Sequence, residues 1–285
     1  MSIEPPPLSV IAEAVARALA EDRAVEDVTT LAAVPPDALA KAAFVAREPG
    51  VLAGMPVVTE VFRQLDPRVR LVVHVSEGER FAAGSVLATA EGPARPLLQG
   101  ERTALNFLQR LSGIATLTRA FVDAVAGTGC TVLDTRKTTP GLRELEKYAV
   151  RCGGGSNHRR DLASMAMIKD NHRELLTRAG ITLAEAVRRI RAKHPGIAIE
   201  IEVDVLAELD EALAAGPEWV LLDNMPPDEL REAVRRIAGR VKVEASGGVS
   251  LATVRAIAET GVDAVSVGSL THSAPALDIA LDLEF

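Results

Sequence analysis

The sequence predicts an α/β protein, with an N-terminal α+β domain followed by an incomplete α/β barrel. Two observations predict this. After residue 130, six short apolar runs alternate with helical segments, which is the pattern of a parallel sheet covered by helices. Before residue 96, helices and strands follow one another without a regular rhythm, which favours a separate α+β domain.

The first third of the chain contains short elements of both kinds. Apolar residues at helical spacing predict helices over 8–21 and 55–65, and alternating residues predict strands over 41–47, 70–75 and 85–90. A long helical pattern then runs over 96–126, and we expect Ser112-Gly113 to break or bend it.

The six apolar runs define the predicted barrel. Each run is rich in Val, Ile and Leu, as expected for strands that are buried on both faces, and each ends in polar residues. Parallel barrels place their ligands at the carboxyl ends of the strands, so these polar residues should meet at one mouth. A full barrel has eight strands, so the barrel is predicted to be incomplete.

The runs read TVLDTRK, MAMIKDNH, IAIEIEVD, WVLLDN, VKVEASGG and AVSVGSLTH, and the helices between them cover 141–151, 183–194, 205–214, 227–238 and 251–259. We therefore expect domains over 1–114 and 115–273, and a C-terminal helix over 274–285 that packs back on the first domain.

Composition excludes several kinds of partner. The net charge is −7 and aromatic residues are only 3%, which argues against nucleic acid as a partner. No apolar run has the length of a membrane helix, and the first residues lack an export-signal pattern. Cys130 and Cys152 do not form a metal-ligand pair, so we expect a reduced, cytoplasmic protein.

A basic region lies within this acidic chain. From Asp134 to Arg173 there are 9 Lys and Arg against 5 Asp and Glu, a balance of +4. Such a concentration of cations indicates a small anionic ligand, because arginine suits bidentate binding of carboxylate or phosphate. The alternative is a structural ion-pair network that includes Asp134 and Asp170. The cationic candidates are Arg136, Lys137, Arg159 and Lys169, together with His158.

Acidic residues and glycine turns follow the later strands. Glu202 and Asp223 could accept hydrogen bonds from sugar hydroxyls, bind Mg²⁺ through water, or stabilise a cationic sugar; a helix cap or a partner for lysine is an alternative. Glycine turns before a helix bind phosphate through backbone N–H groups, often after the last two strands of a barrel. The two candidate turns are Ser246-Gly247-Gly248 and Val267-Gly268-Ser269. His272 could contact the same anion or be structural.

The motif DTRKTTPGLRELEKYAVRCGGGSNHR…MIKDNH, with EASGGV and SVGSLTHS, closely resembles the quinolinate phosphoribosyltransferase family, and ERTALNFLQRLSGIAT is similar to its linking helix. The resemblance implies that quinolinate and phosphoribosyl pyrophosphate (PRPP) give nicotinate mononucleotide, pyrophosphate and CO₂ in NAD biosynthesis, with Mg²⁺. It also implies an N-terminal sandwich and a barrel of about seven strands. Two alternatives remain: a nicotinate phosphoribosyltransferase, and a non-catalytic paralogue of the molybdate-uptake type that binds a phosphorylated ligand.

The resemblance also implies residue roles. Quinolinate would be held by Thr135, Arg136, His158, Arg159 and Lys169, and by Arg102 from the partner subunit of a homodimer, which could assemble further. PRPP would be held by Lys137, Glu202 and Asp223, by Ser246, Gly247 and Gly248, and by Val267, Gly268, Ser269 and His272. Lys137, Lys169, Glu202 and Asp223 would act in catalysis, with Mg²⁺ reached from Glu202 and Asp223 through water or substrate. Water or Lys169 would protonate the carbanion that decarboxylation leaves.

One early loop departs from the family pattern ED-x-G-x-GD-x-TT. Here residues 21–30 read EDRAVEDVTT, so Ala24 and Glu26 stand where the family has glycine. This puts the conformation of the loop in doubt, but not the chemistry of the barrel.

Overall fold

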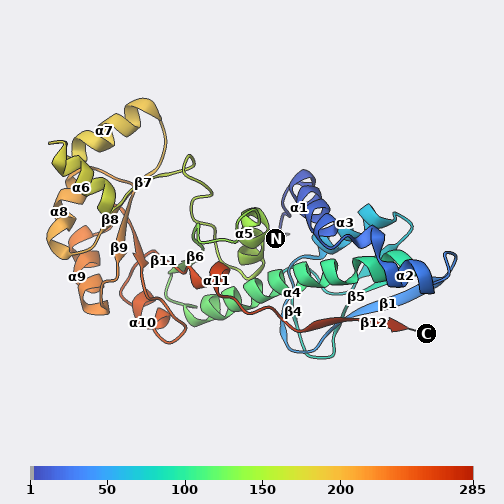
Figure 1. Cartoon of the computed structure of the whole chain (residues 1–285). Coiled ribbons are helices and arrows are strands. Elements are labelled where there is room, and N and C mark those ends of the chain that lie inside the picture. The colour runs from blue at the N-terminus through green and yellow to red at the C-terminus, as the bar shows by residue number, and fades with distance from the viewer. Residues whose placement is uncertain (1–2, 285) are drawn as a thin grey trace. The chain divides into compact units, whose positions relative to one another are not determined.

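The computed structural model describes residues 3–284 and divides into two compact units (Figure 1). The first unit comprises residues 1–119, 137–154 and 269–285, and the second comprises 120–136 and 155–268. The expected domains over 1–114 and 115–273 stay a prediction; in this division residues 137–154 group with the first unit. Residues 1–2 and 285, which the expected ranges include, lie outside the described residues.

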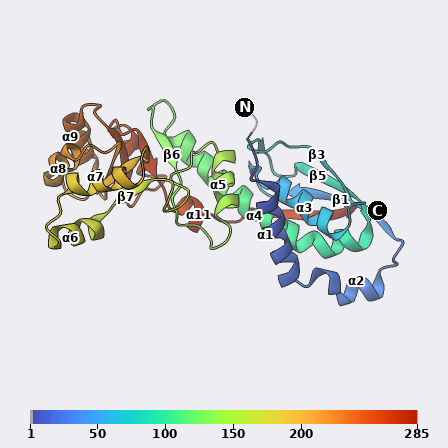
Figure 2. The ribbon, with the colours of Figure 1, turned by 90° about the horizontal axis from the view of Figure 1, so that it is seen from above.

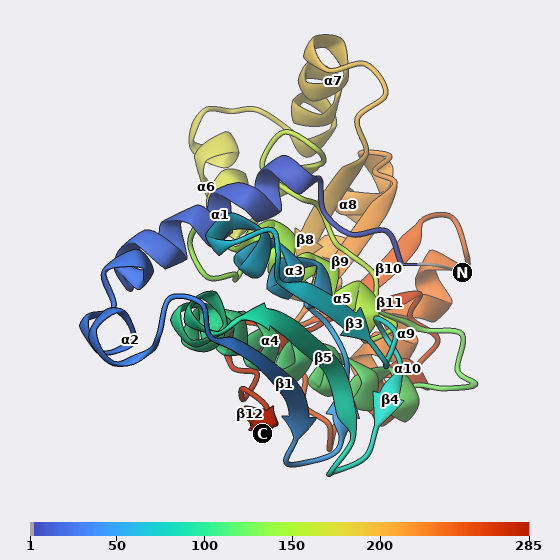
Figure 3. The same ribbon diagram turned by 90° about the vertical axis from the view of Figure 1, so that its right-hand side faces the viewer.

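The first unit contains a four-stranded antiparallel sheet with the strand order β12-β1-β5-β3. Two helices, predicted over 8–21 and 55–65, are confirmed as α1 and α3 with the same bounds. They bury apolar side chains such as Val15 and Val61. The elements before the long helix are α1 Leu8–Glu21, η1 Ala24–Glu26, α2 Val28–Ala33, β1 Leu39–Ala46, β2 Gly50–Val51, α3 Met55–Leu65, β3 Arg70–Val73, β4 Arg80–Phe81 and β5 Val86–Pro93. Figure 3 shows β1 and β5 side by side.

The long helix α4, Ala94–Ala124, is continuous, so the expected break at Ser112-Gly113 is wrong. Packing explains both residues. A Cβ atom on Gly113 would lie 3.0 Å from the carbonyl carbon of Pro275 and would overlap its oxygen. The Ser112 hydroxyl donates to the Ala53 carbonyl at 3.1 Å and accepts from the Ala53 N–H. The pair allows close contact of helix and backbone, which a sequence pattern cannot distinguish from a bend.

The C-terminal segment is a strand, β12 Ile279–Glu284, so the predicted helix over 274–285 is wrong. Its apolar residues Ile279, Leu281 and Leu283 recur every second position, which is the period of a strand. This strand pairs antiparallel with β1 from Lys41 to Ala46, so the segment does join the sheet of the N-terminal region. Two further helices of this unit are α5 Arg143–Cys152 and α11 Ser269–His272.

The early loop tolerates its lost glycines. Among the residues with positive φ, neither Ala24 nor Glu26 appears, whereas Arg23 has φ 49°. Asp27 then caps α2, because its carboxylate accepts hydrogen bonds from the N–H groups of Thr29 and Thr30 at 3.0 Å. The loop therefore forms a regular helix cap without glycine.

The second unit contains a six-stranded parallel sheet with the order β6-β11-β10-β9-β8-β7. From β7 to β11 each strand lies beside the next in sequence, and the last, β11, pairs with the first, β6. Figures 1 and 2 show α7, α8 and α9 along the same side of this sheet. The elements are β6 Thr131–Leu133, β7 Ala166–Ile168, α6 Asp170–Arg178, α7 Leu183–Lys193, β8 Ile199–Val203, η2 Leu206–Glu208, α8 Leu209–Ala214, β9 Trp219–Asp223, α9 Pro227–Ile237, β10 Lys242–Ser246, α10 Val254–Ala258 and β11 Ala264–Ser266.

This order is that of a barrel opened between β6 and β7. All six predicted runs form strands, and an isolated parallel bridge joins Leu133 to Ser156 in the connection after β6. The sheet thus has six strands, whereas the family resemblance implies about seven. The isolated bridge at Ser156 stands where a seventh strand would lie beside β6. Among the described residues, no helix is long and apolar enough to cross a membrane.

Candidate active site

The polar clusters that follow the strands share one edge of the second unit. The six strands are parallel and in register, so their carboxyl ends point the same way. Asp134 and Lys169 follow β6 and β7, Glu202 and Asp223 lie at the ends of β8 and β9, and Ser246 ends β10. For these five residues, the topology of the second unit agrees with a shared edge.

Asp134 orders the connection that fills the gap between β6 and β7. Its side chain is fully buried. One carboxylate oxygen accepts a hydrogen bond from Asn157 Nδ2 at 2.6 Å, and the other accepts from the His158 N–H at 2.8 Å. The buried carboxylate of Asp134 therefore fixes the conformation of Asn157 and His158, and with it the backbone that leads to Arg159.

The guanidinium of Arg159 forms hydrogen bonds but no ion pair within residues 3–284. Its Nη1 donates to the Met165 carbonyl at 3.3 Å. Burial lowers the pKa of Arg159 and the charge of Arg136 lowers it further, and the charges of Glu200, Glu202 and Glu244 only partly offset this. Two cations that repel each other in a partly buried place are stabilised by an anion, which favours the anion-binding interpretation over a structural ion-pair network.

Lys169 does have an acidic partner. Its Nζ donates to Glu202 Oε2 at 2.7 Å, and Glu202 is largely buried. Lys169 itself is 45% exposed. The alternative that Glu202 pairs with a lysine is thus realised in this structure. It remains compatible with ligand binding, because a bound anion can draw Lys169 away from the carboxylate.

Acidic groups gather at the ends of β8 and β9. Burial raises the pKa of Asp204, and the charges of Glu202, Glu208, Asp223 and Asp170 raise it further. Mutual repulsion of carboxylates at one edge produces a negative potential, and carboxylate oxygens are suitable ligands for a hard divalent cation. The Asp223 side chain accepts from Asn224 Nδ2 at 2.6 Å and is half-buried. This region of the mouth therefore fits Mg²⁺.

The glycine turn after β10 has a conformation that requires glycine. Gly247 has φ +89°, and a Cβ atom there would lie 2.8 Å from the backbone nitrogen of Asn224. Gly248, at φ +60°, has no heavy atom near its Cβ position. The Ser246 carbonyl accepts from the Asn224 N–H at 2.9 Å, which joins this turn to the end of β9. The open side at Gly248 gives a ligand access to the backbone, as expected for a phosphate site.

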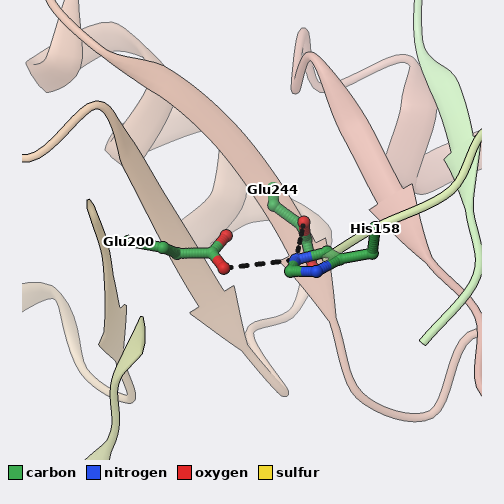
Figure 4. A group of neighbouring side chains, drawn as sticks. All are labelled: His158, Glu200 and Glu244. Atoms are coloured by element: carbon green, nitrogen blue, oxygen red, sulfur yellow. Dashed lines mark ion pairs between the residues drawn. The ribbon is translucent and has the colours of Figure 1, made fainter. Parts of the chain in front are cut away.

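Below the mouth, His158 lies between two buried glutamates (Figure 4). Its Nε2 is 3.2 Å from Glu200 Oε2 and 3.1 Å from Glu244 Oε2. The glutamates come from β8 and β10, which have β9 between them, and both are essentially inaccessible. Barrel interiors are filled by layers of side chains from alternate strands, so these residues form one such layer. No residue of 3–284 other than His158 lies close enough to bind either carboxylate.

This cluster suits a proton better than a metal ion, although three ligand atoms lie within 4.8 Å of one another. The Arg159 N–H donates to His158 Nδ1 at 2.7 Å, so Nδ1 is the acceptor and the ring carries its proton on Nε2. A histidine that binds metal through Nε2 needs its other nitrogen as a donor. We therefore assign the cluster to hydrogen bonding inside the barrel.

Burial and charge both make this cluster hold protons. Burial lowers the pKa of His158, but hydrogen bonds with Glu200 and Glu244 and their charges outweigh it and raise the pKa to about 9. Burial raises the pKa of Glu200. The folded cluster therefore binds a proton more tightly than the same groups do in the unfolded chain.

Sequence reasoning missed Glu200 and Glu244. The available signal was the alternation in IEIEV, where Glu200 and Glu202 are two residues apart and so face the same side of the strand. A charged residue in the middle of a buried strand needs a partner, and His158 is that partner. In the sequence, Glu244 is similarly placed within VKVEAS.

Four candidates belong to the first unit: Arg102, Lys137, Ser269 and His272. Arg102 is exposed on α4, and it makes no side-chain hydrogen bond or ion pair with residues 3–284. Lys137 is exposed, and the Thr271 hydroxyl donates to its carbonyl at 2.7 Å. The other candidates, Thr135, Arg136, Val267 and Gly268 included, lie in the second unit.

Comparison with known proteins covers almost the whole chain. Residues 27–112 match the model of the quinolinate phosphoribosyl transferase N-terminal domain, and residues 114–282 match that of the C-terminal domain. A nicotinate-nucleotide pyrophosphorylase [carboxylating] of Mycobacterium leprae is 47% identical over 95% of this chain and 96% of its own. A probable enzyme of the same name from Bacillus subtilis is 44% identical over 85% of this chain and 83% of its own. The structure of the nicotinate-nucleotide pyrophosphorylase from Francisella tularensis superposes with a TM-score of 0.92 at 37% identity, covering 100% and 99% of the two chains.

Proposed function

This chain belongs to the quinolinate phosphoribosyltransferase family, and we propose that it transfers the phosphoribosyl group of PRPP to quinolinate with loss of CO₂. The products are nicotinate mononucleotide and pyrophosphate, in NAD biosynthesis. Within the second unit, one observation carries the proposal: the Arg159 guanidinium, which forms no ion pair among residues 3–284, lies near a second arginine, at the same edge of the sheet as an acidic region and a glycine turn.

The arginines would bind the acceptor. Quinolinate carries two carboxylates, and Arg136 and Arg159 supply planar donors that suit them. Lys169 and Thr135 complete this pocket by resemblance to the family. His158 supports it from below, since its Nδ1 accepts from the Arg159 N–H. Positioning the diacid makes attack by its ring nitrogen effectively intramolecular.

The acidic side of the mouth would bind the donor. Glu202 and Asp223 accept hydrogen bonds from the ribose hydroxyls, and the turns at Ser246–Gly248 and Val267–Gly268 donate backbone N–H groups to the 5′-phosphate. Mg²⁺ held by Glu202, Asp223 and Asp204 would neutralise charge on the leaving pyrophosphate. By resemblance to the family, Lys137, Ser269 and His272 add contacts to the phosphates.

The reaction needs no protein nucleophile. As pyrophosphate leaves C1 of the ribose, positive charge builds on the sugar, and the carboxylates of Glu202 and Asp223 stabilise it. The pyridinium formed by the new bond then accepts the electron pair released when the adjacent carboxylate leaves as CO₂. Water or the Lys169 ammonium protonates the ring carbon that remains.

Product analysis tests the proposal. Purified protein with PRPP, Mg²⁺ and quinolinate should yield nicotinate mononucleotide and CO₂ in equal amounts. Nicotinate as the acceptor should give no CO₂ and little product, because a monoacid leaves one of the arginines without its anion. Turnover of nicotinate at the same rate would favour the nicotinate phosphoribosyltransferase alternative, and no turnover of either would favour a non-catalytic paralogue.

We also propose that the protein acts as a homodimer in which Arg102 reaches the site of the partner subunit. Support comes from the exposure of Arg102 and from its lack of side-chain partners among residues 3–284. The free, buried thiols of Cys130 and Cys152 agree with a reducing, cytoplasmic setting.

Mixing two inactive variants tests the dimer. Arg102→Ala and Arg159→Ala should each be nearly inactive, but after subunit exchange a heterodimer has one site with both arginines. Because half of the dimers in a random mixture are heterodimers, activity should return to about a quarter of wild type. If the mixture stays as inactive as its components, Arg102 does not act across an interface.

A further inference from the structure

Within the first unit, Arg110 on α4 and Glu146 on α5 form an ion pair, and neither residue is among the candidate site residues predicted from the sequence. Arg110 Nη2 lies 2.9 Å from Glu146 Oε1, and the Glu146 side chain is 0% exposed. A buried carboxylate is costly unless several hydrogen bonds compensate it. The other contacts of this pair therefore show which parts of the chain it holds.

Glu146 fixes the loop that follows Lys137. Its Oε2 accepts from the Thr139 N–H at 3.0 Å, and its Oε1 accepts from the Thr139 hydroxyl at 2.7 Å. Residues 134–142 form neither helix nor strand, so they lack the regular hydrogen bonds that would define their conformation. The buried carboxylate supplies two such bonds only two residues after Lys137.

Arg110 fixes the segment that contains His272. Its guanidinium donates to the Thr271 carbonyl and, at 2.9 Å, to the Ala274 carbonyl. The Thr271 hydroxyl in turn donates to the Lys137 carbonyl at 2.7 Å. The contacts thus close a ring that runs from the 137–139 loop through Glu146, Arg110 and Thr271 and back to Lys137.

We propose that Arg110 and Glu146 are positioning residues that hold Lys137 and His272 in a fixed relative geometry for the phosphate groups of PRPP. The inference rests on the proposed function, which assigns both residues to PRPP. Neither Arg110 nor Glu146 needs to touch the substrate. The pair acts by fixing two backbone segments that are more than 130 residues apart in sequence, as Thr271 and Lys137 show. Such preorganisation lowers the ordering cost of binding a polyanion.

Two variants probe the ring. Glu146→Gln keeps the shape of the side chain but removes its charge, and Thr271→Val keeps the volume but removes the hydrogen bond to Lys137. Each should raise the KM for PRPP and the Kd for pyrophosphate about five- to tenfold, as expected for one buried hydrogen bond. The KM for quinolinate should change less than about twofold, because Arg136 and Arg159 belong to the other unit.

Glu60→Gln is the matched control. Glu60 is also buried in the first unit, 2% exposed, and is paired with Arg63, but it lies on α3 and has no contact with the ring. This variant should lower the melting temperature without changing either KM. Thr271→Val guards against misfolding of Glu146→Gln, because it leaves the buried ion pair in place and removes the hydroxyl that donates to the Lys137 carbonyl.

The outcomes distinguish failure of the positioning role from failure of the proposed function. Equal rises in the KM for PRPP and the KM for quinolinate, or no change in either, would overturn the positioning role. If the wild type forms no nicotinate mononucleotide, the proposed function fails instead. The Kd for pyrophosphate in the variants then tests the positioning role. Weaker pyrophosphate binding in both variants still supports positioning, whereas unchanged binding, or none in the wild type, contradicts it.

Discussion

Two layers of the same barrel use glutamate in opposite ways. Glu200 and Glu202 stand two residues apart on β8 and face the same side of the strand. Glu200, in the interior, has His158 and Glu244 beside its carboxylate, whereas Glu202, at the mouth, pairs with a half-exposed lysine. Burial raises the pKa of Glu200 in the interior layer, whereas Glu202 in the mouth layer has a cationic partner.

The depth of a glutamate in the barrel, more than its residue type, therefore decides its role. At the mouth, Glu202 has a lysine partner that a ligand anion can draw away. A carboxylate without water keeps a proton and acts as a fixed hydrogen-bonding support. The predictions below test whether the mouth layer serves binding and the interior layer serves structure.

The largest effect is expected from Arg159→Ala. The variant leaves a quinolinate carboxylate without its charged donor in a partly desolvated place, which should cost about 2–5 kcal/mol in kcat/KM for quinolinate. Steady-state kinetics would measure this loss. Arg178→Ala is the control, since Arg178 is 73% exposed on α6 and pairs with Glu174 on the same helix. Similar kinetics for the two variants would remove Arg159 from the site.

A smaller effect is expected from Glu202→Gln. The amide keeps the shape but weakens binding of Mg²⁺ and stabilisation of the sugar cation, so kcat should fall by roughly 10- to 100-fold. The Mg²⁺ concentration for half-maximal rate should also rise, which a Mg²⁺ titration would detect. A full rate at the normal Mg²⁺ concentration would place the acidic side of the mouth outside the chemistry.

The interior layer should affect stability through pH. The pKa of His158 is raised from 6.5 to about 9, so the folded cluster binds more protons than the unfolded chain between these values. This stabilisation is complete below about pH 6.5 and is lost as pH rises towards 9, and it amounts to at most about 3 kcal/mol. Glu244→Gln should flatten the dependence of melting temperature on pH over this range. A slope equal to that of the wild type would show that the cluster does not hold the proton.

The smallest effect is expected outside both layers. Ala24→Gly restores a family glycine at a position that does not require positive φ, so it should cost only about 0.5–1 kcal/mol through backbone entropy. Thermal melting would measure this, and kcat should not change. A stabilising effect would mean that the loop prefers the family conformation.

The sequence predicted the parts that depend on local pattern. The helices at Leu8–Glu21 and Met55–Leu65, the six apolar runs and the glycine turn at Gly247 follow from periodicity and backbone chemistry. The tail forms a strand and not the predicted helix, although its period-2 pattern is visible in the sequence.

Other features depend on contacts between distant segments. Gly113 serves close packing against Pro275, and Glu146 serves a loop and a helix that the sequence alone does not bring together. The pairing of His158 with Glu200 and Glu244 required the order of the strands, since β9 separates the two glutamates. Local patterns do not contain this information.

Calorimetric titration of quinolinate and of nicotinate, with and without pyrophosphate and Mg²⁺, tests most directly whether the two arginines bind a diacid. We expect quinolinate to bind the wild type at least tenfold more tightly than nicotinate, a difference of about 1.4 kcal/mol or more, and Arg159→Ala to remove most of that preference. Equal affinity of the wild type for the two acids, or a preference that survives in Arg159→Ala, would contradict the account.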